Sequence, residues 1–208
     1  MIVIVDLGVG NLFNVLRVFN HVGIQAVITD DIEIKKSADK MVLSGVGSFK
    51  VGMDNTRTKG LTGVILQFLE SGKPVLGVCL GMQMLMDYSE ENGGVRGLGV
   101  ISGRVRYLKS INGFLPDFTI PNIGWNTIEA GKSGWSGSVL GNVRVVDEFY
   151  FVHSLCAIAE EKYQLAVSSY AGITFSSVIQ KGNVIGCQFH PEKSGDSGLK
   201  IIREFAKG

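Results

Sequence analysis

Short apolar runs alternate with amphipathic segments through the first half of the chain. The run at 2–5 has no polar residue, which is typical of a parallel strand buried on both faces. Behind it, Asn11 can cap a helix whose apolar residues recur at helical spacing to about His21. The same pattern predicts further strands at 26–28, 41–43 and 74–78, and helices at 61–69, 80–88 and 199–206.

The second half, from Gly99 to Gln188, has mostly two-residue periodicity. It is clearest at 143–146 and 173–179, and Lys181-Gly182-Asn183 is typical of a hairpin turn. The whole pattern predicts an α/β fold with a central, mostly parallel sheet, flanking helices, and antiparallel strands in the second half. No linker or repeat interrupts residues 1–208, so we expect a single domain.

Composition narrows the class of protein. A net charge of +1 gives no support to nucleic-acid binding, and no segment has the roughly 20 apolar residues of a membrane helix. The segment 1–6 lacks the features of a signal peptide. Three cysteines without paired spacing favour a reducing compartment and give no metal motif. We therefore expect a soluble cytoplasmic protein with no metal and no cofactor.

The segment Gly77-Val78-Cys79-Leu80-Gly81 is the strongest chemical signal. It has the form Gly-x-nucleophile-x-Gly between a predicted strand and a predicted helix. Such an elbow presents the central side chain at the carboxyl end of the sheet, and the following helix dipole favours a thiolate. We expect Cys79 to be a nucleophile, and Cys156 and Cys187 to be ordinary buried residues of strands.

A cysteine nucleophile needs a base and a group that orients the base. His190 follows an apolar run, and Glu192 lies two residues further on, across Pro191. The sequence therefore predicts a Cys79, His190, Glu192 triad. An oxyanion would need backbone N–H donors. Leu80, which follows the nucleophile, and the loop Gly45-Val46-Gly47 can supply them.

Six segments together resemble the class I glutamine amidotransferases, and within them the glutaminase subunits of imidazole glycerol phosphate synthases. They are 6–11, 44–49, 77–83, 124–126, 150–154 and 188–195, so the resemblance covers essentially the whole chain. A dinucleotide-binding site is not supported, because the glycine-containing segment 8–13 has Phe13 where that fingerprint needs glycine.

The resemblance implies hydrolysis of L-glutamine to glutamate and ammonia. Cys79 would attack the side-chain amide, His190 would protonate the ammonia, and Glu192 would orient His190. The oxyanion and substrate positions implied by the family are Val46, Gly47, Leu80, Gln83, Glu91, His153 and Ser154. Glycines on both sides of Val46 would let its peptide flip, so we expect weak activity until a partner and its ligand bind.

The resemblance also implies a partner. Ammonia would pass to a (βα)₈-barrel cyclase subunit, in a heterodimer that makes imidazole glycerol phosphate and an aminoimidazole carboxamide ribotide in histidine biosynthesis. Positions implied at that interface are Asn11, Asn14, Trp125, Tyr150 and Lys193.

Three positions depart from the family's usual residues. Ser44 stands in place of proline, Asn122 in place of a frequent histidine, and Leu155 in place of tyrosine. They leave open a paralogue that supplies ammonia to another synthase, for instance in surface-sugar biosynthesis. A cysteine peptidase agrees less well with the family segments 124–126 and 150–154. A non-catalytic binding subunit agrees less well with the intact triad of Cys79, His190 and Glu192.

Overall fold

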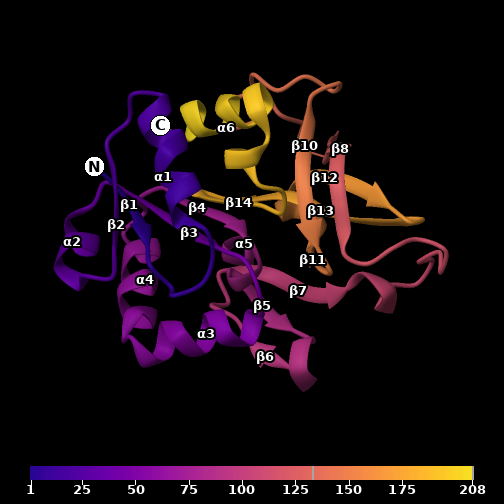
Figure 1. Ribbon diagram of the computed structural model, residues 1–208, viewed down its shortest axis with the longest axis horizontal. Helices are drawn as coiled ribbons and strands as arrows, with labels where there is room; N and C mark the ends of the chain where they lie inside the picture. Colours follow the sequence, from indigo (N-terminus) through magenta and orange to yellow (C-terminus); the bar gives the residue numbers. More distant parts are fainter. Residues whose placement is uncertain (133, 208) are drawn as a thin grey trace.

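The computed structural model describes residues 1–132 and 134–207, and it is built around an eight-stranded sheet (Figure 1). The sheet has the order β2-β1-β3-β4-β14-β13-β12-β9. Its strands are β1 (Ile2–Val5), β2 (Ala26–Thr29), β3 (Lys40–Gly45), β4 (Val75–Cys79), β9 (Glu129–Ala130), β12 (Gln164–Tyr170), β13 (Ile173–Lys181) and β14 (Val184–Cys187). The first five in the order are parallel to one another and the rest are added antiparallel, which confirms the predicted fold class.

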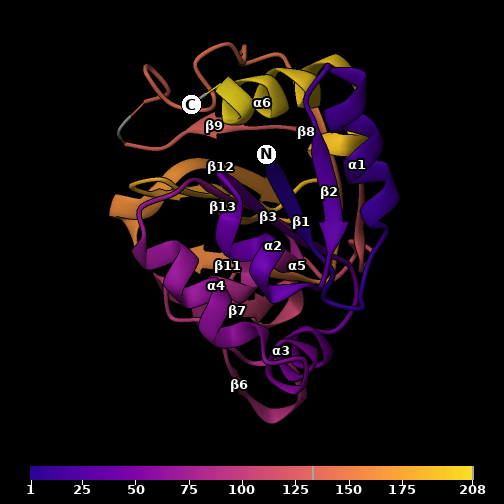
Figure 2. The same cartoon turned by 90° about the vertical axis from the view of Figure 1, so that its left-hand side faces the viewer.

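Helices cover both faces of the sheet. The helices are α1 (Leu12–His21), α2 (Ile32–Ser37), α3 (Phe49–Thr58), α4 (Leu61–Glu70), α5 (Leu80–Met84) and α6 (Gly195–Lys207). Helices α1 and α6 pack on one face, and α3 and α4 lie on the other (Figure 2). None of the described helices is long and apolar enough to cross a membrane.

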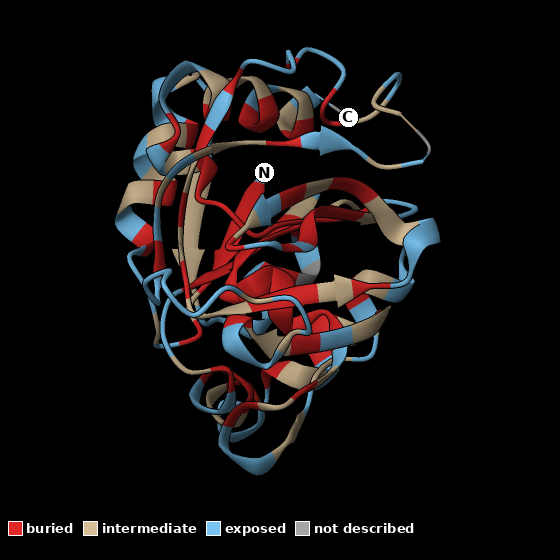
Figure 3. Ribbon diagram, turned by 90° about the vertical axis from the view of Figure 1, so that its right-hand side faces the viewer, coloured by how far each residue is buried: buried red, intermediate tan, exposed pale blue. Residues whose placement is uncertain are grey.

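Alternating side chains of the parallel strands enter two separate cores. Ile2 and Ile4 of β1 pack with α1 and α6, whereas Val3 and Val5 pack with α3 and α4. Burial on both faces is why these strands consist of unbroken apolar runs. The central strands are buried along their length, while the loops are exposed (Figure 3).

Two smaller sheets flank the large one. One pairs β8 (Asn122–Thr127) with β10 (Glu148–His153), and the other has the order β11-β7-β5-β6. The strands of the second are β5 (Met86–Ser89), β6 (Val95–Arg96), β7 (Ile101–Tyr107) and β11 (Leu155–Ala159). Four single 3₁₀ turns complete the described elements, at Glu91–Gly93, Leu108–Ser110, Glu161–Tyr163 and Pro191–Lys193. The predicted hairpin is present, because Lys181 pairs with Val184 across the turn between β13 and β14.

The helix predicted at 80–88 is wrong in its second half. Helix α5 ends at Met84, and the chain continues as β5, which pairs with β6 and β7. The carbonyl of Leu85 accepts hydrogen bonds from the amides of Val100 and Ile101 rather than from a helical turn. An apolar run of this length does not separate helix from strand by periodicity, and tertiary pairing decided it.

The strand predicted at 143–146 is also wrong. The segment is a turn, in which the amide of Asp147 bonds the carbonyl of Arg144. Val145 and Val146 are exposed, so their apolar character does not indicate burial in a sheet. The sequence analysis also missed helices α2 and α3, although Asp31 and Ser48 cap them as acceptors.

Candidate active site

The turn from β4 into α5 is the predicted elbow. Cys79 has φ of 51° and ψ of −107°, a strained conformation for a residue other than glycine. A Cβ at Gly77 would lie 2.8 Å from the backbone of Met82, and one at Gly81 would lie 1.8 Å from the carbonyl oxygen of Leu43. Both flanking glycines are therefore required by close backbone packing, as the sequence pattern predicted.

The strand register gathers the site at one edge of the sheet. Gly45, the last residue of β3, pairs with Cys79, and Cys187, the last residue of β14, pairs with Val78. The segments that follow β3 and β14 consequently begin next to the elbow. They carry the glycine loop 45–47 and the predicted base, and open α/β sheets place ligands at this carboxyl edge.

His190 and Glu192 form a buried pair. Nδ1 of His190 lies 2.6 Å from Oε1 of Glu192, and the side chains are 1% and 4% exposed. The backbone fixes the histidine, since its N–H donates to the Tyr150 carbonyl and its own carbonyl accepts from the Ser194 hydroxyl. The predicted orientation of His190 by Glu192 is present in the geometry.

The electrostatics of His190 link it to both neighbours. Burial lowers the pKa of His190, but the hydrogen bonds and negative charges of Cys79 and Glu192 outweigh burial and raise that pKa to about 10. The other ring nitrogen, Nε2, is buried and makes no hydrogen bond of ordinary geometry to a described residue. The interaction with Cys79 that raises the pKa of His190 is therefore not a hydrogen bond of ordinary geometry. A protonated His190 stabilises negative charge on the sulfur.

The glycine loop after β3 is packed on one side and open on the other. A Cβ at Gly10 would lie 2.7 Å from Cα of Gly45, so the loop after β1 contacts this backbone directly. Gly47 has φ of 110° and open space beside it, and Val46 is exposed. Leu80 begins α5 directly after the nucleophile. The loop and the start of α5 therefore flank Cys79.

Gln83 and His153 meet at one carbonyl oxygen beside the elbow. Nε2 of Gln83 donates to the carbonyl of Leu155 over 3.0 Å, and Nδ1 of His153 lies 2.9 Å from the same oxygen. Asn122 lies opposite His153 in the β8–β10 register, and its Nδ2 is 3.1 Å from Nε2 of His153. Ser154 lies between β10 and β11.

His153 is a neutral neighbour of the predicted base. Burial lowers the pKa of His153 to about 4, assisted by the charge of His190, although the Leu155 carbonyl opposes the shift. With Nδ1 donating to Leu155, Nε2 is the acceptor and Asn122 is the donor. His153 is therefore held as one tautomer and adds no charge at neutral pH.

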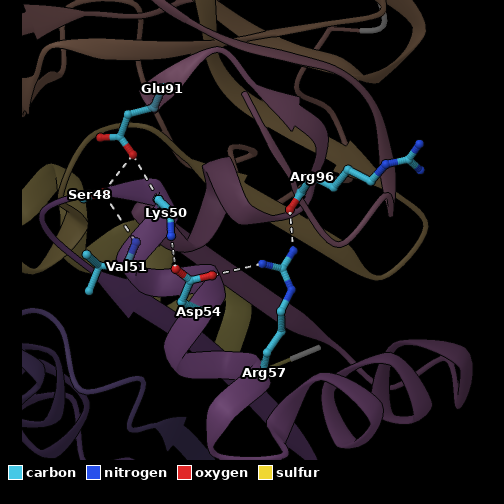
Figure 4. A network of polar contacts seen from close by, with 7 residues as sticks. All are labelled: Ser48, Lys50, Val51, Asp54, Arg57, Glu91 and Arg96. Carbon is cyan, nitrogen blue, oxygen red and sulfur yellow. Dashed lines mark hydrogen bonds and ion pairs between the residues drawn. The ribbon is translucent and has the colours of Figure 1, made fainter. Parts of the chain in front are cut away.

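Glu91 is tied to the start of α3 (Figure 4). Its Oε2 accepts from the Ser48 hydroxyl over 2.9 Å and from the Lys50 amide over 3.0 Å. Ser48 in turn caps α3 by accepting from the Val51 amide. No described residue donates to Oε1 of Glu91, so one oxygen of this largely buried carboxylate is available to a cationic ligand.

Three of the predicted interface residues, Trp125, Tyr150 and Lys193, lie together. Trp125 and Tyr150 are register partners on β8 and β10, with ring centroids 5.9 Å apart, and Nζ of Lys193 is 5.7 Å from the Tyr150 ring centroid. Trp125 is 54% exposed, so it is not a core residue. Asn11 caps α1 by accepting from the amide of Asn14.

Gln188 is a site residue whose role the sequence analysis missed. It is fully buried, and its Nε2 lies 3.8 Å from the sulfur of Cys79. Its place two residues before His190, at the end of an apolar run, was the available signal. Cys156 and Cys187 are buried in strands, and burial raises the pKa of each thiol. Within the described ranges no cluster of His, Cys, Asp and Glu could hold a metal ion.

Known proteins are similar to this chain in sequence and in fold. A family model described as glutamine amidotransferase class-I matches residues 3–207. Imidazole glycerol phosphate synthase subunit HisH 1 of Legionella pneumophila (strain Lens) is 44% identical, over 97% of this chain and 96% of its own length. Subunit HisH of Geobacillus sp. (strain WCH70) is 39% identical, over 99% and 96%.

A solved structure described as a glutamine amidotransferase superposes with a TM-score of 0.74 at 16% identity, covering 100% of this chain and 99% of the other. At that identity the likeness concerns the fold alone. The sequence match over nearly the whole length goes further, and it agrees with the elbow cysteine and the histidine–glutamate pair. On both grounds the chain belongs to the class I glutamine amidotransferase family.

Proposed function

We propose that this chain is the glutaminase subunit of an imidazole glycerol phosphate synthase and releases ammonia from L-glutamine. The observation that carries the proposal is the strained elbow at Cys79, adjoined by the buried His190–Glu192 pair, whose histidine responds electrostatically to the sulfur. The relatives with 39–44% identity support the choice of this synthase. The family match over 3–207 supports a single domain.

The triad performs acyl transfer in two steps. The Cys79 sulfur attacks the carbon of the glutamine side-chain amide, and the carbonyl oxygen becomes an oxyanion. His190 delivers its proton to the nitrogen, so that the C–N bond breaks and ammonia leaves. Water, deprotonated by His190, then adds to the thioester, and glutamate departs as the sulfur recovers its electron pair.

The surrounding residues are assigned to substrate and oxyanion. The amides of Val46 and Leu80 are proposed as oxyanion donors, since both residues flank the elbow. Gly47, Gln83, His153 and Ser154 are proposed to line the glutamine pocket. Glu91 is proposed to bind the α-ammonium group through its available oxygen. No step needs a metal or a cofactor.

The acceptor of the ammonia is proposed to be a (βα)₈-barrel cyclase. The interface would include Asn11, Asn14, Trp125, Tyr150 and Lys193; the last three form an aromatic–cation cluster with Trp125 largely exposed. Tryptophan and tyrosine are enriched among the residues that dominate binding at interfaces, so an exposed tryptophan beside a tyrosine supports this assignment. The open side of the Val46–Gly47 backbone leaves room for the peptide to turn when the partner binds.

The test is glutamate release from glutamine with and without a histidine-pathway cyclase barrel, and with and without its ribulosyl nucleotide ligand. We expect weak release by the chain alone and strong stimulation that needs both the barrel and the nucleotide. Full activity of the isolated chain would contradict the proposed activation. Absent stimulation would exclude this synthase and favour the paralogue that serves another acceptor.

Two cysteine variants test the nucleophile in the same assay. Cys79→Ala should abolish glutamate release while barrel binding persists, because alanine removes only the sulfur and keeps the Cβ and the backbone of the elbow. Cys156→Ala is the matched control, since Cys156 is a buried strand residue outside the site. Retained hydrolysis by Cys79→Ala would refute the triad assignment.

A further inference from the structure

We propose that Gln188 is a positioning residue that donates a hydrogen bond to the Cys79 sulfur while holding the side chain of Gln83. This inference rests on the proposed function in taking Cys79 as the nucleophile and Gln83 as a residue of the glutamine pocket. It assigns Gln188 to the reaction through Cys79 and Gln83, without contact to glutamine.

The sheet places Gln188 next to the elbow. Strands β14 and β4 are parallel, with Ile185 opposite Leu76 and Cys187 opposite Val78. The next residues along the two strands are Gln188 and Cys79. The Gln188 backbone is held independently of its side chain, because its N–H donates to the Ser177 carbonyl over 2.9 Å. A substitution of the side chain thus leaves the backbone anchor intact.

The hydrogen-bond network fixes which end of the Gln188 amide faces the sulfur. Nε2 of Gln83 donates to the Leu155 carbonyl, which can only accept. The same Nε2 lies 3.1 Å from the Gln188 amide, so Gln188 presents its oxygen, Oε1, to Gln83. Its amino group, Nε2, must then face Cys79, 3.8 Å from the sulfur.

Burial strengthens the effect of the Gln188 donor on the sulfur. Gln188 is completely buried, and Gln83 and Cys79 are also buried, so water does not compete for these groups. An N–H group aimed at a buried sulfur stabilises the thiolate more than the thiol, because hydrogen bonds to charged acceptors are stronger. Among the described residues, His190 is an ionisable group that interacts with Cys79, and Glu192 lies behind it. Gln188 approaches from β14 and adds a neutral donor to the charge of His190.

The connection to Gln83 gives the residue a second task. Gln83 has its nitrogen bonded to two acceptors, and no described residue donates to its Oε1. Gln188 and Leu155 therefore turn the Gln83 amide so that its oxygen is free for a ligand. One buried side chain thus orients the nucleophile and a residue of the proposed glutamine pocket.

The experiment measures alkylation of Cys79 by iodoacetamide across pH in the full chain, with the site identified by mass spectrometry. Gln188→Leu removes the donor and should move the midpoint for thiolate reactivity upward by about one pH unit, roughly a tenfold lower rate at pH 7. Gln188→Met is a second variant that keeps an unbranched side chain of similar length but has no N–H group. It should shift the midpoint in the same direction and by a similar amount.

Gln164→Leu is the control, because its side-chain amide also donates a hydrogen bond within the chain, to the carbonyl of Ala159, but lies away from the elbow. It should alkylate as the unmodified chain does. In the barrel-activated glutaminase assay, Gln188→Leu should lower kcat more than it raises KM, since Gln83 keeps its bond to Leu155. Circular dichroism and barrel binding report whether each variant folds.

The outcomes separate the two proposals. If Gln188→Leu folds and its alkylation midpoint stays within about 0.2 pH unit of the unmodified chain, the positioning role is wrong. If Gln188→Leu does not fold, Gln188→Met decides, and alkylation at the unmodified rate would overturn the role. Alkylation reads the sulfur directly, so it tests Gln188 even where no glutaminase activity is found. Failure of the proposed function would show instead as retained glutamine hydrolysis in Cys79→Ala.

Discussion

The backbone N–H of His190 donates to the carbonyl of Tyr150 over 2.9 Å. The amide of Tyr150 in turn donates to the Ser194 hydroxyl, which bonds the His190 carbonyl. The ring of Tyr150 contacts Trp125 and lies under the Lys193 ammonium group. The same residue therefore belongs to the exposed aromatic cluster and fixes the backbone of the proposed base. A partner bound at that cluster would lie one residue away from the triad.

Removing the carboxylate beside His190 should change its protonation. In Glu192→Gln the raising effect of the charge is lost while burial still lowers the pKa of His190, so that pKa must fall from about 10. We expect a downward shift of about one pH unit or more. Since the chain has three histidines, the ring proton of His190 can be followed by NMR titration.

The same variant should lower glutaminase kcat by about 100-fold or more, because the imidazole loses both its orientation and its charge partner. Asp196→Asn is the control, since it removes an exposed carboxylate four residues away. An unchanged His190 titration in Glu192→Gln would show that the carboxylate does not tune the base.

Glu91→Gln should affect binding of glutamine more than its chemistry. The amide can still accept from Ser48 and Lys50, so the contact with α3 survives, but the charge offered to the α-ammonium group is gone. We expect KM to rise about tenfold, with a smaller change in kcat. Steady-state kinetics with the barrel partner measure both constants.

The neighbouring carboxylate provides the control for Glu91. Glu90 accepts from the Tyr107 amide and lies 3.4 Å from Nε of Arg106, so its contacts are with β7 rather than with α3. Glu90→Gln should leave KM unaltered. Equal effects of the two variants would mean that local folding, rather than charge at Glu91, sets KM.

Trp125→Ala should weaken binding of the cyclase barrel. The ring is 54% exposed yet contacts Tyr150, and truncating a central interface tryptophan commonly costs 2 kcal/mol or more, roughly 30-fold in Kd. Isothermal titration calorimetry gives the Kd. Ile34→Ala is the control. Ile34 is exposed on α2, which lies at the left in Figure 1, opposite β8 and β10 at the right, so this variant should bind normally. Normal binding by Trp125→Ala would place the interface elsewhere.

Asp147 should stabilise the fold in a pH-dependent way. Burial raises its pKa, but hydrogen bonds from Arg144 and Lys200 outweigh burial and lower the pKa from 3.8 to about 2. A depressed carboxyl pKa stabilises the native state above the unfolded value, and this stabilisation is lost as the pH falls toward 2. The shift corresponds to about 2 kcal/mol of unfolding free energy at pH 7.

Asp147→Asn should therefore unfold at lower urea concentration at pH 7, and its difference from the unmodified chain should shrink between pH 4 and pH 2. Asp54→Asn removes an exposed carboxylate that pairs with Lys50 and Arg57, and should change stability little. A pH-independent difference for Asp147→Asn would indicate that packing, not charge, accounts for the loss.

Much of the parallel half of the fold was predictable from local pattern. The unbroken run at 2–5, the cap at Asn11 and the turn at 181–183 each appear where the sequence indicated them. They are determined by neighbours in the chain, through burial on both faces, a capping side chain and a glycine turn. The turn at 143–146 and the end of α5 were not predictable, because their residues depend on Asp147, β6 and β7.

The sequence by itself determined the residue types of the site and the elbow that strains Cys79, since glycines at 77 and 81 carry that information locally. Only the tertiary structure decided which other distant residues lie beside the sulfur and around the predicted base. The register of β14 against β4 brings Gln188, 109 residues away in sequence, to Cys79, and the β8–β10 pairing sets Asn122 against His153. Strand register depends on long-range burial and hydrogen bonding, which no local pattern records.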